Sequence, residues 1–374
     1  MKIIVAIDSF KGSMTSMQAG YAAKEGILRV MPDADVIVRP LADGGEGTTD
    51  ALIEGLGGIM RTITVTGPLG KQVSANYGIL PEKKLAIIEM AAAAGITLEL
   101  EKKPLIATTY GVGEMIVDAI NEGCENFIIG IGGSATNDGG VGMLQALGYV
   151  FLDKNNNPVE GGAGCLEKII SIDDKNVLSS LKHCKIKVAC DVNNPLYGAN
   201  GATYVYGPQK GITDELLEAV ENGMKNYAKI SASYLGENYA DRAGTGAAGG
   251  LGFALLAYLN ATLTAGIELI LNAIELEKDM ETADYVITGE GRLDFQTAMG
   301  KVPVGVAKLA KKYDRRVIAF SGSVTPEARE CNRQGIDAFF PIMRSVVTLE
   351  EAMDTENAKN NMSDTVEQVF RLLL

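Results

Sequence analysis

The chain opens with the stretch IIVAIDSFKGS (residues 3–13), in which an apolar run leads directly into an acidic residue and a loop. The same arrangement recurs at residues 36–48, 127–140, 285–294 and 317–323. Short apolar runs that end in small or acidic residues predict buried strands, each followed by a loop. In open α/β sheets, ligands bind outside the carboxyl ends of the strands. The pattern therefore predicts an α/β protein whose ligand site is formed by these loops.

Composition excludes several classes of function. The net charge of −13 argues against binding nucleic acid or an anionic membrane surface, because basic surfaces bind both. No apolar stretch reaches about 18 residues, so no transmembrane helix and no membrane partner are expected. The five cysteines show no CxxC spacing, which is typical of reduced thiols and favours a cytoplasmic protein. With His183 as the single histidine, a carboxylate is expected as general base and a histidine-based metal site is not.

The order of predicted elements indicates two domains, which a chain of 374 residues can accommodate. Residues 62–66 and 73–79 alternate apolar and polar residues around a Gly-Pro turn, which predicts a β-hairpin. The expected fold class is α/β, with a doubly wound parallel sheet in one domain and a mixed α/β domain formed by inserted segments. The first domain is predicted to comprise residues 1–60, 106–148 and 276–374, and the second residues 61–105 and 149–275.

The loop LADGGEGT (residues 41–48) carries the sharpest chemical signal, with Asp43 and Glu46 among three glycines. A turn followed by a helix cap is one reading. A ligand or magnesium role is favoured, because glycine lets the backbone approach an anion and carboxylates are hard oxygen ligands for Mg²⁺. Lys11 in the first loop can meet a phosphate or a carboxylate, the alternative being a solvated loop lysine.

Three further loops carry candidate residues. The loop at residues 132–140 (GGSATNDGG) precedes a predicted helix and suits a phosphate. Asp191 opens DVNNPL (residues 191–196), which is either a ligand loop or an Asx-rich turn before a proline. Arg292 lies between Glu290 and Asp294, and an internal ion pair is the alternative to a ligand role.

The run GTGAAGGLG (residues 244–252) matches the letters of the dinucleotide fingerprint at Gly244, Gly246 and Gly249. That fingerprint requires a preceding strand, and none is predicted, so phosphate binding or close packing is favoured over NAD binding. An NAD-linked hydroxyacid dehydrogenase is the first alternative function, and it needs that strand. A non-catalytic metabolite-binding protein is the second alternative function. It does not account for the acidic residues in several strand-end loops.

Taken together, these loops resemble the type 1 glycerate kinase family. The matching stretches are residues 6–13, 41–48, 130–140, 191–196, 207–211, 244–252 and 288–294. The resemblance implies ATP-dependent phosphorylation of D-glycerate to a phosphoglycerate, at a position that the sequence does not decide. It also implies two α/β domains with the site in the cleft between them, one of the domains being Rossmann- or flavodoxin-like.

We infer the residue roles from this activity, with ATP and Mg²⁺ as cofactors and D-glycerate and ATP as partners. The expected catalytic residues are Asp43, Asp191, Lys11 and Arg292, of which Asp43 and Asp191 are also the expected metal ligands. The expected cofactor-binding residues are Gly132, Gly133, Ser134, Thr136, Asn137, Gly244, Gly246, Gly249 and Glu290. The expected substrate-binding residues are Ser9, Lys11, Gly44, Gly45 and Asn193. The oligomeric state stays open, a homodimer being one option.

Overall fold

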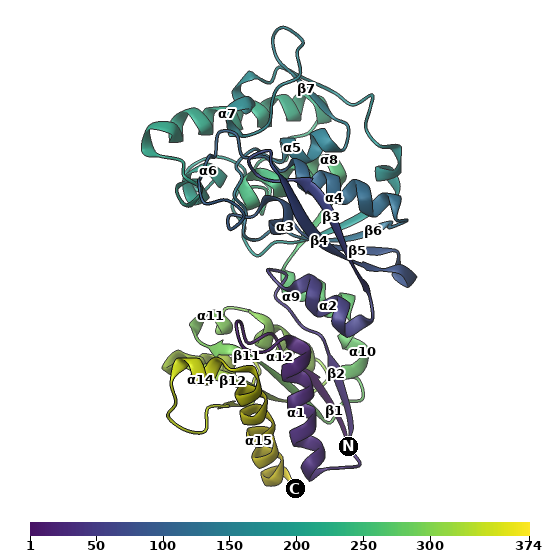
Figure 1. Ribbon diagram of the computed structural model, residues 1–374, viewed down its shortest axis with the longest axis vertical. Coiled ribbons are helices and arrows are strands. Elements are labelled where there is room, and N and C mark those ends of the chain that lie inside the picture. The colour runs from purple at the N-terminus through teal and green to yellow at the C-terminus, as the bar shows by residue number, and fades with distance from the viewer. The chain divides into compact units, whose positions relative to one another are not determined.

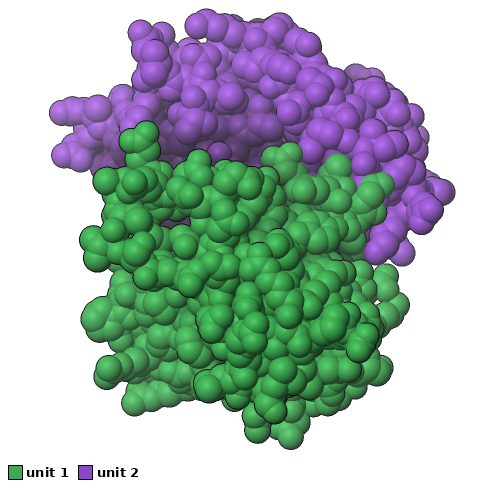
Figure 2. Space-filling model, turned by 60° about the horizontal axis from the view of Figure 1, so that its bottom comes forward, with its two compact units in different colours: residues 1–43, 50–57, 267–374 green, residues 44–49, 58–266 purple.

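The computed structural model describes all 374 residues and divides them into two compact units (Figure 2). Unit 1 comprises residues 1–43, 50–57 and 267–374, and unit 2 comprises residues 44–49 and 58–266. Each unit contains its own large sheet and its own hydrophobic core. No helix combines the length and the apolar character needed to cross a bilayer.

Unit 1 is built on a five-stranded parallel sheet with the strand order β13-β12-β11-β1-β2. Its strands are β1 (Lys2–Ala6), β2 (Asp35–Arg39), β11 (Tyr285–Leu293), β12 (Arg316–Val324) and β13 (Ala338–Pro341). In register, Ile4 of β1 lies between Val286 of β11 and Ile37 of β2. β2, the next strand along the chain, pairs with one side of β1, and β11 pairs with the other side. The strand order therefore reverses beside β1.

Some helices of unit 1 pack on the sheet, and others pack on those helices. The helices are α1 (Ser16–Val30), most of α2 (Thr48–Leu56) and of α9 (Gly266–Ala273), α10 (Leu276–Met280), α11 (Phe295–Ala298), α12 (Val302–Lys311), α13 (Glu330–Arg333), α14 (Leu349–Met353) and α15 (Thr355–Leu373), with the 3-10 helix η6 (Pro326–Arg329). Ile3 and Val5 of β1 share a core with α1 and α15, and α12 contacts β11 and β12. Alternate residues of β1 such as Ile4 are fully buried as well, as expected for a parallel sheet with both faces covered.

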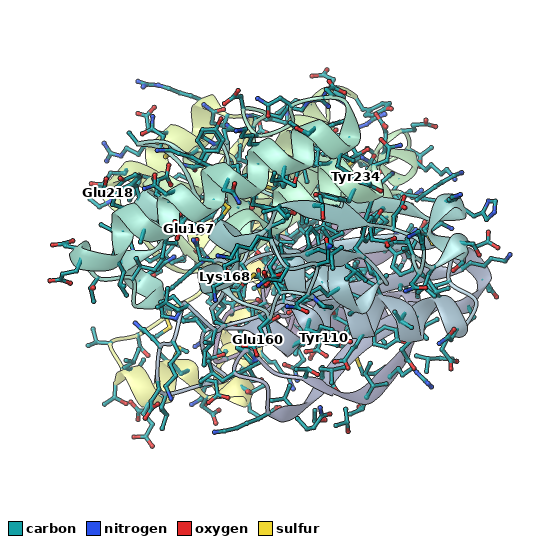
Figure 3. The ribbon with its side chains drawn as sticks, turned by 90° about the horizontal axis from the view of Figure 1, so that it is seen from above. Tyr110, Glu160, Glu167, Lys168, Glu218 and Tyr234 are labelled. Atoms are coloured by element: carbon teal, nitrogen blue, oxygen red, sulfur yellow. The ribbon has the colours of Figure 1, made fainter.

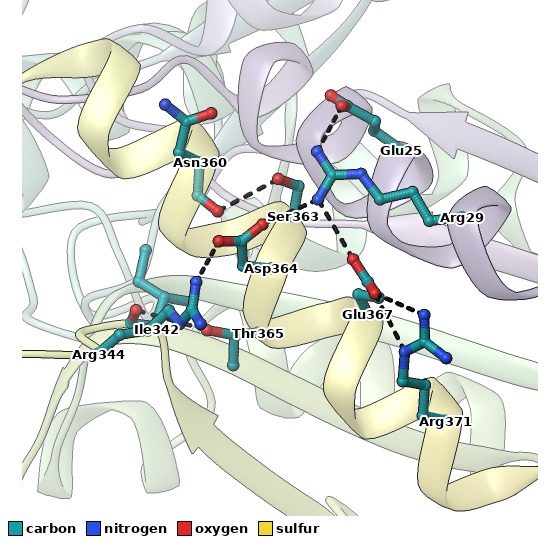
Figure 4. A network of polar contacts seen from close by, with 10 residues as sticks. All are labelled: Glu25, Arg29, Ile342, Arg344, Asn360, Ser363, Asp364, Thr365, Glu367 and Arg371. Carbon is teal, nitrogen blue, oxygen red and sulfur yellow. Dashed lines mark hydrogen bonds and ion pairs between the residues drawn. The ribbon is translucent and has the colours of Figure 1, made fainter.

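Helices α1 and α15 lie side by side (Figure 1). Thr15 and Gln18 form a capping box at the start of α1. Farther along α1, Arg29 donates to Asp364 at 2.8 Å and to Glu367 at 3.4 Å on α15 (Figure 4). Because Arg29 is half-exposed, these ion pairs contribute little to stability, and the close packing of the two helices contributes more.

Unit 2 contains a six-stranded mixed sheet with the order β10-β9-β6-β5-β4-β3 and a separate two-stranded sheet, β7-β8. The strands are β3 (Ile59–Thr66), β4 (Gln72–Leu80), β5 (Leu85–Glu89), β6 (Asn126–Gly130), β7 (Val150–Leu152), β8 (Ser171–Asp173), β9 (Lys185–Ala189) and β10 (Thr262–Thr264). The pairs β3-β4 and β4-β5 are antiparallel, whereas β5, β6, β9 and β10 run parallel. The β3-β4 pair is the predicted hairpin, with Thr66 opposite Gln72 at its turn.

The helices of unit 2 surround this sheet. They are α3 (Ala91–Ala94), α4 (Tyr110–Asn121), α5 (Val141–Ala146), α6 (Ala202–Tyr206), α7 (Asp214–Leu235) and α8 (Leu251–Leu259), with the 3-10 helices η1 (Pro81–Lys83), η2 (Ala163–Lys168), η3 (Ser179–His183), η4 (Pro208–Lys210) and η5 (Ala247–Gly250). Figure 3 labels Glu218 and Tyr234 toward the two ends of α7, which packs on η2. Tyr227, from the buried side of α7, contacts Phe253 edge-on with ring centroids 5.4 Å apart.

One part of the predicted domain division differs from the structure. Residues 106–148 lie in unit 2 and not with the chain ends, because β6 pairs with β5 and β9 of the mixed sheet. The apolar pattern of residues 127–131 predicts a buried strand equally well in either sheet, since it carries no information about which strands lie beside it. The α/β class is as expected, and so is the presence of a parallel sheet.

The close packing of α1 on α15 makes Gly26 a sensitive position. A Cβ atom added there would lie 2.2 Å from the carbonyl oxygen of Ser363 and 3.0 Å from the Cβ of Val366. We expect Gly26→Ala to lower the free energy of unfolding by roughly 1–3 kcal/mol, although alanine favours the helix by about 1 kcal/mol. Urea denaturation measures the change, with exposed Glu25→Ala on the same helix as control. A free energy of unfolding equal to that of the wild type would contradict the expectation, because it would mean that α15 moves away from the added methyl group at no cost.

Candidate functional site

A cavity of about 550 Å³ lies within unit 1. Its polar lining consists of Asp8, Ser9, Lys11, Ser13, Asp43, Glu290, Arg292, Asp294, Lys301 and Ser323. Its apolar lining consists of Phe10, Ile342, Met343, Leu349, Ala352, Met353 and Ala358. This volume is in the range of ordinary small-molecule sites.

The topology of the sheet positions the acids of this cavity. Asp8 follows β1, Asp43 follows β2, and Glu290 lies in the carboxyl-terminal half of β11. The backbone N–H of Asp8 donates to the carbonyl of Gly289 at 2.9 Å, which holds the loop after β1 against β11. The acids therefore gather at the carboxyl edge of the sheet, where the strand order reverses. This is the place at which open α/β sheets bind ligands.

Asp8 is a buried carboxyl group in a negative environment. It is 8% exposed, and one carboxylate oxygen accepts from the Ser9 N–H at 2.7 Å. Burial is the largest cause that raises the pKa of Asp8 to about 7, and repulsion from Asp43 and Glu290 adds to it, whereas the Ser9 N–H and Lys11 act in the opposite direction. A carboxyl group with this pKa can accept a proton near neutral pH or bind a cation that relieves the repulsion.

Glu290 is the second buried acid of the cavity. Burial raises its pKa above the ordinary value of a glutamate, and the hydroxyl of Thr297, which donates to Oε1, acts in the opposite direction. Asp294 has a structural task, since its side chain accepts from the N–H groups of Gln296 and Thr297 and caps α11. These partners orient both carboxyl groups.

The basic residues of the cavity are solvent-accessible. Lys11, Arg292 and Lys301 are all exposed. The guanidinium of Arg292 lies 3.8 Å from Asp294, so the ion pair considered as the alternative reading is present, and at this exposure it contributes little to stability. Arg292 therefore keeps most of its charge available for an anion.

The remaining predicted catalytic and substrate residues lie in unit 2 or at its border. Asp191 is exposed after β9, and its Oδ1 accepts from the N–H of Gly266 at 2.9 Å. Asn193, two residues on, is also exposed. Gly44 has φ +87° and is buried, and a Cβ there would lie 2.7 Å from the Cβ of Ala189. Glycine is thus required at Gly44 by conformation and by packing, and Gly45 follows it in the same loop.

The predicted cofactor loops of unit 2 pack against each other. Gly139 donates to the carbonyl of Gly249 at 2.9 Å, and a Cβ on Gly249 would lie 2.0 Å from the carbonyl oxygen of Thr136. A Cβ on Gly246 would lie 2.2 Å from the carbonyl oxygen of Pro195. In this run, close backbone approach accounts for Gly246 and Gly249 without a ligand.

Some residues of unit 2 that were predicted to bind the cofactor are exposed, and most are buried. Gly132 and Gly133 are exposed, whereas Ser134, Thr136, Asn137, Gly244, Gly246 and Gly249 are buried. No strand precedes Gly244, since residues 236–246 form turns and bends, so the structural context of a dinucleotide fingerprint is absent.

Unit 2 also holds a buried lysine that the sequence did not single out as a site residue. Lys210 is 2% exposed, and its Nζ donates to the carbonyl of Thr136 at 2.7 Å. Burial lowers its pKa to about 7, and the buried Asp138 acts in the opposite direction. Asp138 accepts from the N–H and the hydroxyl of Thr109, both at 2.8 Å. Lys210 and Asp138 thus hold residues 134–138 in place from inside the unit.

The structure adds residues to the predicted set and separates others. Lys11, Asp43, Glu290, Arg292 and Ser9 line one cavity, which also contains Asp8, Lys301 and an apolar wall that were not predicted as site residues. The acid Asp8 was visible in the sequence because it directly follows an apolar run. Apart from Phe10, the apolar wall comes from residues 342–358, which show no motif. Asp191 and Asn193 belong to unit 2. No group of three His, Cys, Asp or Glu side chains has the geometry to hold a metal by itself.

The raised pKa of Asp8 predicts a pH-dependent stability. The unfolded chain loses this proton near pH 4 and the folded chain near pH 7, so stability is lost as pH rises through that window. We expect Asp8→Asn to remove the loss and to gain on the order of 2–4 kcal/mol relative to the wild type between pH 4 and pH 8. Denaturation across this range without ligands measures the difference, with exposed Asp33→Asn as control. A difference independent of pH would contradict the buried charge cluster.

Comparison with known proteins is consistent across the whole chain. The profile of the Glycerate kinase family matches residues 3–374. A glycerate kinase of Bacillus subtilis (strain 168) is 46% identical over 371 residues, which cover 99% of this chain and 97% of that protein. A glycerate 2-kinase of Escherichia coli (strain K12) is 46% identical over 354 residues, with coverage of 94% and 93%. A crystal structure assigned as glycerate kinase 2 from Salmonella typhimurium LT2 superposes with a TM-score of 0.92 at 45% identity, covering 100% of this chain and 98% of that chain. The chain belongs to the glycerate kinase family.

Proposed function

We propose that this protein transfers the γ-phosphoryl group of ATP to D-glycerate. The observation that carries the proposal is the 46% identity to a glycerate kinase over nearly the full length of both chains. A hydroxyl oxygen of glycerate attacks the γ-phosphorus, the bond to the β–γ bridging oxygen breaks, ADP leaves, and the hydroxyl proton passes to a carboxylate. The name of the Escherichia coli relative supports the 2-hydroxyl as acceptor, and the order of the motifs supports the type 1 subfamily.

The donor set of unit 1 fits a magnesium ion. The carboxyl groups of Asp8, Asp43 and Glu290 offer hard oxygens. Burial is the largest cause that raises the pKa values of Asp8 and Glu290, and repulsion from Asp43 adds to both. Mg²⁺ commonly takes one or two carboxylates and completes its shell with phosphates and water, which agrees with the absence of a larger ligand cluster. When bound with ATP, the ion neutralises charge on the transferring group.

The side chains of the cavity have complementary proposed roles. We propose Asp43 as a metal ligand or base, as the sequence predicts, and add Asp8, whose pKa of about 7 suits a proton acceptor at neutral pH. Lys11 and Arg292 hold negative oxygens, since some local cation must attract an anionic substrate to a protein of net charge −13. The proposed roles of Asp191 in metal binding and catalysis, of Ser9, Gly44, Gly45 and Asn193 in glycerate binding, and of the glycine loops of unit 2 in cofactor binding stay predictions.

The finer description of the fold is also a proposal. The parallel order of the unit 1 strands, with α1 and α12 packed on the sheet, supports a doubly wound domain of Rossmann or flavodoxin type. We propose that the two units are separate domains. That residues of both serve one site stays a prediction, as do the cytoplasmic location and the homodimer.

An assay with ATP, Mg²⁺ and D-glycerate tests the proposed function. We expect ADP and 2-phosphoglycerate to form in equal amounts, with no change in nicotinamide absorbance when NAD replaces ATP. EDTA is expected to abolish turnover and added Mg²⁺ to restore it, because the phosphates need charge neutralisation. Separation of 2- from 3-phosphoglycerate identifies the acceptor hydroxyl. Full activity in metal-free buffer would contradict the metal, and the absence of either product would contradict the kinase.

Asp43 is proposed as a metal ligand or base, and both roles require a negatively charged carboxylate. Asp43→Asn keeps the size and removes the charge, so we expect an intact fold and a fall in kcat on the order of a hundredfold or more. Circular dichroism and steady-state kinetics measure the two properties. Asp50→Asn, at an exposed position in α2, is the matched control and should retain activity. A folded Asp43→Asn enzyme with wild-type kcat/KM would reduce Asp43 to a loop residue.

A further inference from the structure

One wall of the unit 1 cavity is apolar, and two of its large side chains are exposed. Leu349 is 78% exposed and Met353 37% exposed, although both are large apolar side chains. Both lie on α14, and the same wall includes Met343 and buried Ile342. Exposed apolar side chains that line a cavity mark a surface for an apolar ligand group.

Glycerate has no apolar surface that could pack against such a wall. It is a three-carbon acid that carries a carboxylate and two hydroxyl groups, so each of its faces is polar. A cavity of about 550 Å³ is also far larger than so small a molecule requires. The base of a nucleotide is flat with apolar faces, and the flexible thioether side chains of Met343 and Met353 can fit against such a ring.

The rest of the cavity suits the phosphates of a nucleotide. Lys11, Arg292 and Lys301 supply three positive charges. The acids Asp8, Asp43 and Glu290 line the same cavity and would repel phosphates unless a divalent cation lay between them. An apolar wall, three cations and a set of carboxylates in one cavity match a base, a phosphate chain and a magnesium ion.

We infer that the nucleotide binds in the unit 1 cavity, with its base against Met343, Leu349 and Met353 and its phosphates toward Lys11, Arg292 and Lys301. This inference rests on the proposed function and gives the nucleotide a place other than the glycine loops of unit 2. Close packing already accounts for Gly246 and Gly249 in those loops, and most of the predicted cofactor residues there are buried.

A tryptophan reporter tests the position of the base, because the chain contains no tryptophan. Leu349→Trp places one indole on the wall, and Val346→Trp places one three residues earlier, at a fully exposed position outside the cavity lining. Titration with Mg²⁺ and ADP should quench the Leu349→Trp emission saturably and leave the Val346→Trp emission unchanged. D-Glycerate alone should quench neither. Quenching of Leu349→Trp by glycerate but not by ADP would overturn the inference.

Binding constants provide a second measurement. With a fluorescent ribose-modified ADP and Mg²⁺, we expect Leu349→Ser to raise Kd about fivefold to tenfold, the effect of losing part of one leucine contact. The matched variant Val346→Ser should bind like the wild type. Unchanged binding in Leu349→Ser, or equally weakened binding in Val346→Ser, would overturn the inference.

The two proposals fail in different ways. Nucleotide binding is measured without glycerate, so a protein that phosphorylates another acceptor would still respond at Leu349. Conversely, if the wild type phosphorylates glycerate but Leu349→Ser binds ADP with an unchanged Kd, the proposed function stands and the proposed position of the nucleotide is wrong. The effect of Leu349→Ser on KM for ATP and not on KM for glycerate gives the same separation in the active enzyme.

Discussion

Burial of a carboxyl group beside other acids, at the carboxyl edge of a parallel sheet, is the constraint on which the unit 1 site depends. Asp8 is buried beside Asp43 and Glu290, and burial, with repulsion from both, keeps its pKa near 7. A fold that needed only stability would replace such a group by an apolar residue. Its presence, together with three basic residues that line the same cavity, agrees with the proposed ligand, a nucleotide with its metal ion.

Strand topology explains why these acids meet. β1 lies between β2 and β11, so the loops after β1 and β2 and the end of β11 reach the same edge, although Asp8 and Glu290 are far apart in sequence. The glycines of unit 2 reflect a different requirement. There, segments around Gly139, Gly249 and Pro195 approach so closely that a Cβ at Gly249 or Gly246 would clash with a backbone carbonyl. Glycine-rich loops in one chain therefore follow from two physical causes, and only contacts distinguish them.

Several features were determined by the sequence alone. The apolar runs before Asp8 and Asp43 and the hairpin around Gly67-Pro68 are local patterns, and the structure confirms each as a strand or a hairpin. The resemblance to glycerate kinases rested on loop motifs that keep their order along the chain, and the family comparison confirms it. Such features depend on neighbours within a few residues, which a sequence displays directly.

Only the tertiary structure decided the rest. It assigned residues 126–130 to the mixed sheet, buried Thr136 and Asn137, and left Asp191 exposed. It also brought Leu349 and Met353 to the cavity that contains Asp8, although residues 342–358 carry no motif. Burial, desolvation and strand neighbours are set by contacts between residues that lie tens to hundreds of positions apart. A local pattern cannot encode these contacts, and for that reason the acids were visible in the sequence and the apolar wall beside them was not.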